Sequence, residues 1–131
     1  METVLRYGLT PVMYNMERAQ SLSRLAMAAG KSVQVHVKVD TGMGRVGVPL
    51  EQALEFVRQV KGLRGLVLEG ICTHFATAEE EDFSFTRWQA AAFETLYREL
   101  TLSGIHIPLR HAANCRCRPE SILRPRSSAP G

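Results

Sequence analysis

The chain has 131 residues, of which 45% are hydrophobic and 22% charged, and its formal net charge is +3. This composition is typical of one globular domain and argues against a disordered polypeptide. Neither a basic start followed by an apolar run nor a stretch of about eighteen apolar residues is found, so we expect no signal peptide, no membrane association and a cytoplasmic location. An odd number of cysteines favours reduced thiols over disulfides; they are Cys72, Cys115 and Cys117.

The excess positive charge lies at the C-terminal end. Residues 1–109 contain 11 Lys and Arg against 12 Asp and Glu, whereas residues 110–131 contain five arginines against Glu120 alone. A basic segment can bind nucleic acid. This one has no aromatic residue for stacking and no lysine, so we expect no nucleic-acid partner.

The first third of the chain predicts a strand, a helix and a second strand. Residues 9–14 form the first strand, and Asn15 is the N-cap of a helix that ends at Gly30. Apolar residues recur in this helix at helical spacing: Ala19, Leu22, Leu25, Ala26 and Ala29. Over residues 33–40 valines alternate with polar residues, which predicts a strand with one apolar and one polar face. The polar face can simply be solvated, or it can carry a site.

The rest of the chain continues the alternation. Pro49 opens a helix that ends at Gly62, and residues 66–74 form a strand whose apolar run is interrupted by Glu69. The acidic run 79–82 precedes a helix over residues 84–102 that Gly104 closes, and residues 105–111 form a last strand. The inner face of that helix is predicted to hold Phe85, Trp88, Ala92, Phe93, Leu96 and Leu100.

Strands and helices that alternate in this way are typical of right-handed βαβ units and an α/β fold with a parallel sheet. An open sheet and a barrel remain alternatives, because periodicity does not distinguish them. A closed (β/α)₈ barrel needs eight strands and about 250 residues. This chain therefore has room for about half of one.

Polar residues follow the predicted strands at the ends where parallel α/β folds bind ligands. A loop with three glycines, residues 41–47, follows the strand that contains Lys38, and it carries Arg45. Two cations at one site imply an anionic ligand. The alternative is an internal salt-bridge network in which Asp40 pairs with Lys38. The loop lacks the spacing of dinucleotide-binding and P-loop motifs.

Three ordered motifs resemble one known family. Residues 36–47 (HVKVDTGMGRVG), 69–76 (EGICTHFA) and 111–114 (HAAN) are similar to the signatures of alanine racemases, as are residues 10–19. The resemblance implies part of an N-terminal (β/α)₈ barrel over residues 1–114. Residues 115–131 depart from it, and we expect them to form an irregular basic tail rich in Arg, Ser and Pro.

The resemblance also implies an activity and its site. Alanine racemases use pyridoxal 5'-phosphate to interconvert L- and D-alanine, which supplies D-alanine for peptidoglycan, and they act as homodimers. Arg45 would donate to the phenolic oxygen of the cofactor, and Lys38, carbamylated in many relatives, would hold Arg45 in place as a catalytic support. Met43 lies where the family's backbone NH contacts the substrate carboxylate.

Three further positions would face the cofactor. By the same resemblance His74 lies beside the pyridine ring and Asn114 near the phosphate, while Cys115 stands where the family has a serine. His111, Cys115 and Cys117 could also be interpreted as metal ligands. Their spacing lacks a fourth ligand and the usual cysteine pairs, so we predict no metal site there.

Two residues that the family needs for proton transfer have no match. None of the three lysines, Lys31, Lys38 and Lys61, matches the Schiff-base lysine, and the opposite-face tyrosine of the partner subunit lies beyond the region of resemblance. We therefore expect the isolated chain to be inactive. A non-catalytic barrel fragment and a related serine racemase are the alternatives. Half a barrel exposes strand edges and an apolar interior, so we also expect marginal stability.

Overall fold

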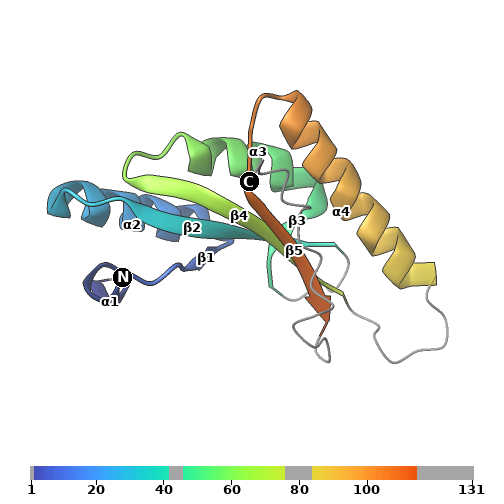
Figure 1. Cartoon of the computed structure of the whole chain (residues 1–131), viewed down its shortest axis with the longest axis horizontal. Coiled ribbons are helices and arrows are strands. Elements are labelled where there is room, and N and C mark those ends of the chain that lie inside the picture. Colours follow the sequence, from blue (N-terminus) through green and yellow to red (C-terminus); the bar gives the residue numbers. More distant parts are fainter. Residues whose placement is uncertain (1, 42–45, 76–83, 115–131) are drawn as a thin grey trace, which may run out of the picture.

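A computed structural model describes residues 2–41, 46–75 and 84–114. Helices and strands alternate in this part of the chain (Figure 1). In chain order they are α1 (Glu2–Tyr7), β1 (Val12–Met13), α2 (Met16–Ala29), β2 (Val33–Asp40), β3 (Val48–Pro49), α3 (Leu50–Lys61), β4 (Leu66–Phe75), α4 (Ser84–Leu102) and β5 (Leu109–Asn114).

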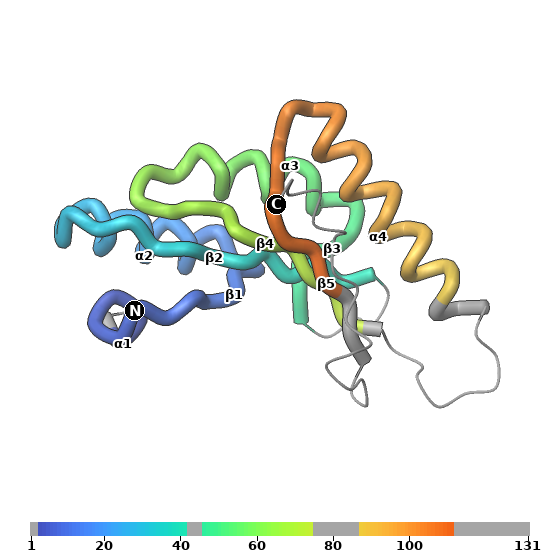
Figure 2. Tube along the Cα trace, in the orientation of Figure 1, coloured from blue at the N-terminus to red at the C-terminus, as the bar shows by residue number. Residues whose placement is uncertain are grey.

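All the described strands pair in parallel. The sheet has the order β1-β2-β4-β5, and the short β3 pairs with the end of β2. Figure 2 shows α1 and α2 towards one end of the molecule and α4 with β5 towards the other. The predicted parallel βα architecture is therefore confirmed.

One face of the sheet is buried against α2, α3 and α4. The four valines of β2 from Val33 to Val39 are 0–6% exposed, while the polar residues between them are partly or fully exposed. The helices contribute a common set of buried residues: Leu22 and Ala26 from α2, Val57 and Val60 from α3, and Phe93, Leu96 and Leu100 from α4. Removal of this apolar area from water provides the main force that holds the layers together.

An irregularity in the pairing of β2 with β4 lies at Glu69. Val35 pairs with Leu68, whereas His36 pairs with Gly70, so Glu69 is an extra residue between the two pairs. Such a β-bulge changes which side chains of a strand share a face. The apolar run that Glu69 interrupts can therefore keep its buried side chains on the helix side both before and after the bulge.

Helix ends follow the predictions closely. The Asn15 side chain accepts a hydrogen bond from the backbone N–H of Arg18 at 3.1 Å, and Gly30 ends α2 in the left-handed conformation with φ 64°. The predicted start of α3 after Pro49 and its end at Gly62 are confirmed as well. No pattern in the sequence predicts α1.

The predicted strand over residues 105–111 is wrong in its bounds, because β5 begins four residues later. Ile105 and Ile107 alternate as in a strand, but they fill the core from the connection before β5, at 6% and 1% exposure. The Tyr97 hydroxyl donates to the Ile107 carbonyl at 2.8 Å. Arg110, the second residue of β5, lies over the Tyr97 ring.

The predicted inner face of α4 is corrected at one position. Trp88 is 55% exposed, whereas its neighbour Gln89 is fully buried. The side chain of Phe85 and the acidic run 79–82 lie outside the described residues. The prediction placed every apolar residue of the helical stripe inward, but the helix turns Gln89 to the sheet because it has a hydrogen-bond partner there.

That partner belongs to a buried polar network at the carboxyl ends of β2 and β4. Gln89 Nε2 donates to Thr41 Oγ1 at 3.3 Å, and Thr41 Oγ1 lies 2.8 Å from Thr73 Oγ1. Thr73 Oγ1 also donates to the Val39 carbonyl at 2.9 Å. The network fixes Thr41, the residue at which the chain leaves β2 for the glycine-rich loop.

We expect Gln89→Met, which keeps the volume of the side chain, to lower the free energy of unfolding by about 1–2 kcal/mol, because buried hydrogen bonds are lost. Urea denaturation followed by circular dichroism measures the change. The matched control is Gln59→Met on the exposed side of α3, which should stay within about 0.5 kcal/mol of the parent. Equal midpoints for the two variants would contradict a stabilising network.

Candidate functional site

The face of the sheet opposite the helices carries a set of polar residues. His36, Lys38 and Asp40 alternate along β2 on this face, and each is partly exposed. In the register of the sheet Lys38 pairs with Cys72 of β4, and Cys72 pairs with His111 of β5. Side chains from three neighbouring strands therefore share one surface.

Two histidines and a glutamate on this face form a hydrogen-bonded chain. His36 Nδ1 lies 3.2 Å from His111 Nε2, and His36 Nε2 lies 3.0 Å from Glu69 Oε2. The two rings are tilted by 56° with centroids 5.4 Å apart. The chain links β2, β4 and β5. It is a feature that the sequence analysis missed, since residues 36 and 111 lie 75 positions apart.

Gly70 makes this contact possible. It pairs with His36 in the sheet, and a Cβ added to it would be 2.9–3.0 Å from atoms of the His36 imidazole. That approach is closer than side chains tolerate, so only a glycine lets the ring cross β4. The sequence signal was the Glu69-Gly70 pair inside an otherwise apolar strand.

The electrostatics of the face favour neutral groups at its centre. Burial raises the pKa of the Cys72 thiol to about 11, and the nearby Lys38 cation offsets only part of that rise. Burial, together with the neighbouring His36, lowers the pKa of His111. At neutral pH Cys72 is therefore a protonated thiol, a poor nucleophile, and His111 is an uncharged imidazole.

The residues predicted to form the site are placed only in part. Lys38 and His74 lie near the carboxyl ends of adjacent strands β2 and β4, and by the register both are on the face away from the helices. Asn114 ends β5, where its backbone pairs with that of Phe75. Three predicted positions lie outside the described residues: Met43, Arg45 and Cys115. The pairing of Lys38 with Asp40 stays a prediction.

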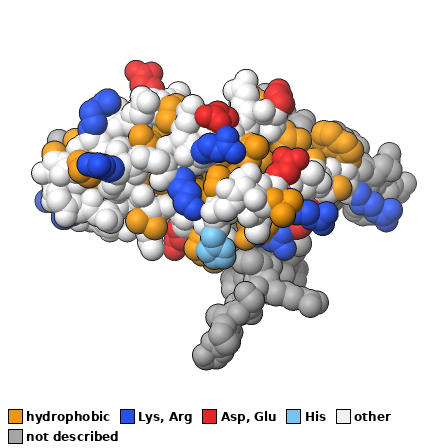
Figure 3. Space-filling model, turned by 90° about the horizontal axis from the view of Figure 1, so that it is seen from above, with side chains coloured by type: hydrophobic (Ala, Val, Ile, Leu, Met, Phe, Trp, Pro, Cys, Tyr) orange, Lys and Arg blue, Asp and Glu red, His pale blue; other side chains and the backbone are white. Residues whose placement is uncertain are grey.

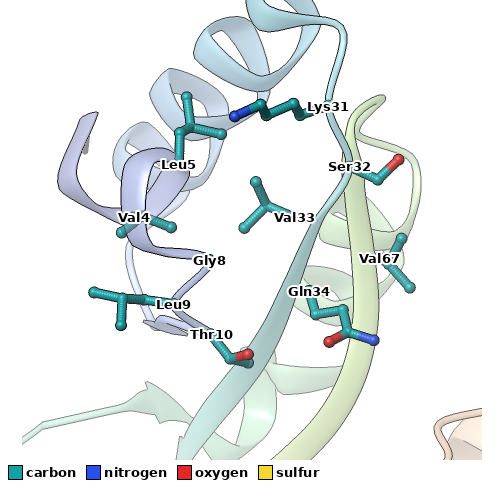
Figure 4. A pocket seen from close by; sticks show the side chains of 10 residues that line it. All are labelled: Val4, Leu5, Gly8, Leu9, Thr10, Lys31, Ser32, Val33, Gln34 and Val67. Carbon is teal, nitrogen blue, oxygen red and sulfur yellow. The ribbon is translucent and has the colours of Figure 1, made fainter.

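A cavity of about 560 Å³ lies at the opposite ends of the strands. Figure 4 shows it between α1, which contributes Val4 and Leu5, and the start of β2, with Val67 of β4 at its side. Lys31 is the one charged side chain among its lining residues. The cavity is therefore separate from the carboxyl ends that carry Lys38 and His74.

Comparison with known proteins identifies the family. The sequence profile described as "Alanine racemase, N-terminal domain" matches residues 1–118. The chain belongs to the alanine racemase family. Its relatives include the alanine racemases of Desulforamulus reducens, 44% identical over 111 residues, and of Halothermothrix orenii, 42% identical over 113 residues. These matches cover 84% and 86% of this chain but 30% of each relative.

Solved alanine racemases share the fold. The alanine racemase of Clostridium difficile 630 superimposes with a TM-score of 0.82 at 32% identity, covering 87% of this chain and 32% of that chain. The parallel βα units are thus part of the TIM-barrel domain of this family, which decides between the barrel and the open sheet. The chain spans about 30% of the length of these relatives.

We expect Gly70→Ala to lower the free energy of unfolding by about 1–3 kcal/mol, because the new methyl group displaces the His36 ring and breaks its contact with His111. Chemical denaturation measures the difference. Gly62→Ala is the matched control, since Gly62 has φ −79° and its nearest neighbour would be 3.5 Å from the added Cβ. A Gly70→Ala chain as stable as Gly62→Ala would show that His36 does not need this space.

Proposed function

We propose that the chain forms one wall of the active site of a pyridoxal-phosphate-dependent alanine racemase, which interconverts L- and D-alanine. The observation that carries the proposal is the pair Lys38 and His74 at the carboxyl ends of adjacent strands, on the face that the helices leave uncovered. Family membership over residues 1–118 supports it. Carboxyl ends of barrel strands are where enzymes of this architecture bind their ligands.

The donors present fit the cofactor that the family implies. An ammonium group and an imidazole are groups that hold anionic or aromatic nitrogen-containing ligands. In the proposal Lys38 is carbamylated, which makes it an anion that holds Arg45, and Arg45 donates to the phenolic oxygen. His74 borders the pyridine ring. When bound, pyridoxal phosphate supplies an electron sink for the charge left as the α-proton of the amino acid is removed.

The proposal assigns the remaining contacts to the loops after β2 and β5. The backbone N–H of Met43 binds the carboxylate of the amino acid, while Asn114 and Cys115 lie towards the phosphate. Proton transfer on the two faces of the substrate needs a lysine and a tyrosine that this chain does not match, so residues 1–114 position the cofactor and do not move the proton. Homodimer formation, a cytoplasmic location and the supply of D-alanine for peptidoglycan are further parts of the proposal.

Two further features concern other kinds of partner. No helix in the described part of the chain is long and apolar enough to cross a membrane. On the face shown in Figure 3, basic and acidic side chains are interspersed with hydrophobic ones and are not separated by sign. A nucleic-acid interface would instead gather basic side chains on one surface.

A chimeric enzyme tests the proposal. The 111 residues of this chain that match the Desulforamulus reducens alanine racemase replace the corresponding segment of that enzyme, and D-alanine formation from L-alanine is measured. We expect a soluble, active enzyme in which Arg45→Ala lowers kcat by about 10²–10³-fold, as the loss of a charge-stabilising donor does elsewhere. Arg64→Ala, an exposed arginine outside the proposed site, is the matched control. A folded chimera without activity, or equal rates for both variants, would contradict the proposal.

The 131-residue chain by itself should form no D-alanine when pyridoxal phosphate is added, because neither proton-transfer residue is matched in it. A coupled D-amino-acid oxidase assay measures the product in a preparation from a host that lacks its own alanine racemase genes. Turnover above the no-protein blank would show that residues of this chain alone can transfer the proton.

A further inference from the structure

The linked pair His36 and His111, with Glu69 behind it, has no part in the proposed function. It lies on the same face as Lys38 but one step nearer the middle of the strands, since His36 pairs with Gly70 and Lys38 with Cys72. His36 and Glu69 are only partly exposed, at 17% and 27% of their side-chain surface.

The distance between the two imidazoles matches a metal-binding geometry. Zinc–nitrogen bonds of 2.0–2.1 Å at a tetrahedral angle place two ligand nitrogens about 3.3–3.4 Å apart. His36 Nδ1 and His111 Nε2 are 3.2 Å apart. A small tilt of the rings therefore admits an ion where the hydrogen bond now lies.

Glu69 supplies the second feature of such a site. Its Oε2 atom is 3.0 Å from His36 Nε2, so the carboxylate favours a proton on that nitrogen and leaves the lone pair of Nδ1 directed at His111. A carboxylate on the far nitrogen of a ligating histidine is the usual support in metal sites, where it fixes the tautomer and raises the basicity of the ligand. In the metal-free chain His111 Nε2 is then the donor to His36 Nδ1, and His111 becomes a ligand when its proton moves to Nδ1.

We propose that His36 and His111 bind one Zn²⁺ or Cu²⁺ ion, supported by Glu69, and that the ion joins β2 to β5 across β4. Imidazole nitrogens suit these metals. In the described part of the chain no group of three or more His, Cys, Asp or Glu surrounds a metal position, so water fills the other coordination positions.

The site differs from the one considered in the sequence analysis. That pattern joined His111 to Cys115 and Cys117, neighbours along the chain, and it lacked a fourth ligand. Here both ligands come from strands, which hold side chains more precisely than loops do. The ion would also tie the edge strand β5 to the centre of the sheet.

Calorimetric titration of the untagged 131-residue chain with Zn²⁺ tests the proposal. We expect one ion per chain and an affinity at least about tenfold lower in His36→Gln and in His111→Gln. Glu69→Gln should weaken binding by about 10–100-fold, the range found for outer-shell partners. The matched control is His106→Gln, an exposed histidine outside the pair, which should bind as the parent does.

Two measurements on the unsubstituted chain test the proposal even if a variant does not fold. Electron spin echo spectra of the Cu²⁺ form should show two coordinated imidazoles, and Zn²⁺ should shift the ring ¹⁵N resonances of His36 and His111 but not of His106. One imidazole per copper, unshifted resonances of the pair, or a loss in His106→Gln equal to that in His36→Gln would each overturn the proposal.

Discussion

Burial of the valine face of β2 against three helices is the constraint on which the rest of the structure depends. Because side chains alternate along a strand, the same residues that place Val35, Val37 and Val39 in the core necessarily place His36, Lys38 and Asp40 on the other side. The polar row cannot rotate away without exposing the core. Packing on one face thus fixes the position of the candidate chemistry on the other.

Two local features let the elements next to β2 pack with the same division into a buried and a polar face. The bulge at Glu69 lets β4 keep its apolar side chains against the helices while it presents a carboxylate, a glycine and a thiol to the polar face. At the carboxyl ends of β2 and β4, the side chains of Thr41, Thr73 and Gln89 form hydrogen bonds with one another inside the core. These bonds fix the position of Thr41, the residue that follows β2. Both features place polar atoms near the boundary between the core and the site, where each of these atoms has a hydrogen-bond partner.

Much of the fold could be predicted from the sequence, because local signals determine it. The alternation in β2, the Asn15 cap and the glycine at the end of α2 act within a few residues, and they were predicted correctly. The errors arose where tertiary contacts prevail. Ile105 and Ile107 alternate like strand residues, but they are buried in the core from the segment that connects α4 to β5. On α4, Gln89 is buried and Trp88 is exposed, because Thr41 accepts a hydrogen bond from Gln89.

The candidate site could be predicted only in outline. Strand-end positions such as Lys38 and His74 follow from parallel topology, and the resemblance of three motifs indicated the family. The contact of His36 with His111 joins residues that lie 75 positions apart, across a third strand, so no spacing rule reveals it. The only sign of this contact in the sequence is Gly70 within an otherwise apolar strand. The structure explains that glycine, because the His36 ring lies against it.

The bulge in β4 has a consequence for how this strand can change. Before Glu69, even-numbered residues of β4 face the helices; after it, odd-numbered residues do. Loss of Glu69 would leave Leu68 inward, Gly70 outward and Ile71 inward, in an uninterrupted ladder with β2. The core would keep its side chains, and the carboxylate beside His36 would be lost. The packing of the core therefore does not require the extra residue, whose side chain serves the polar face.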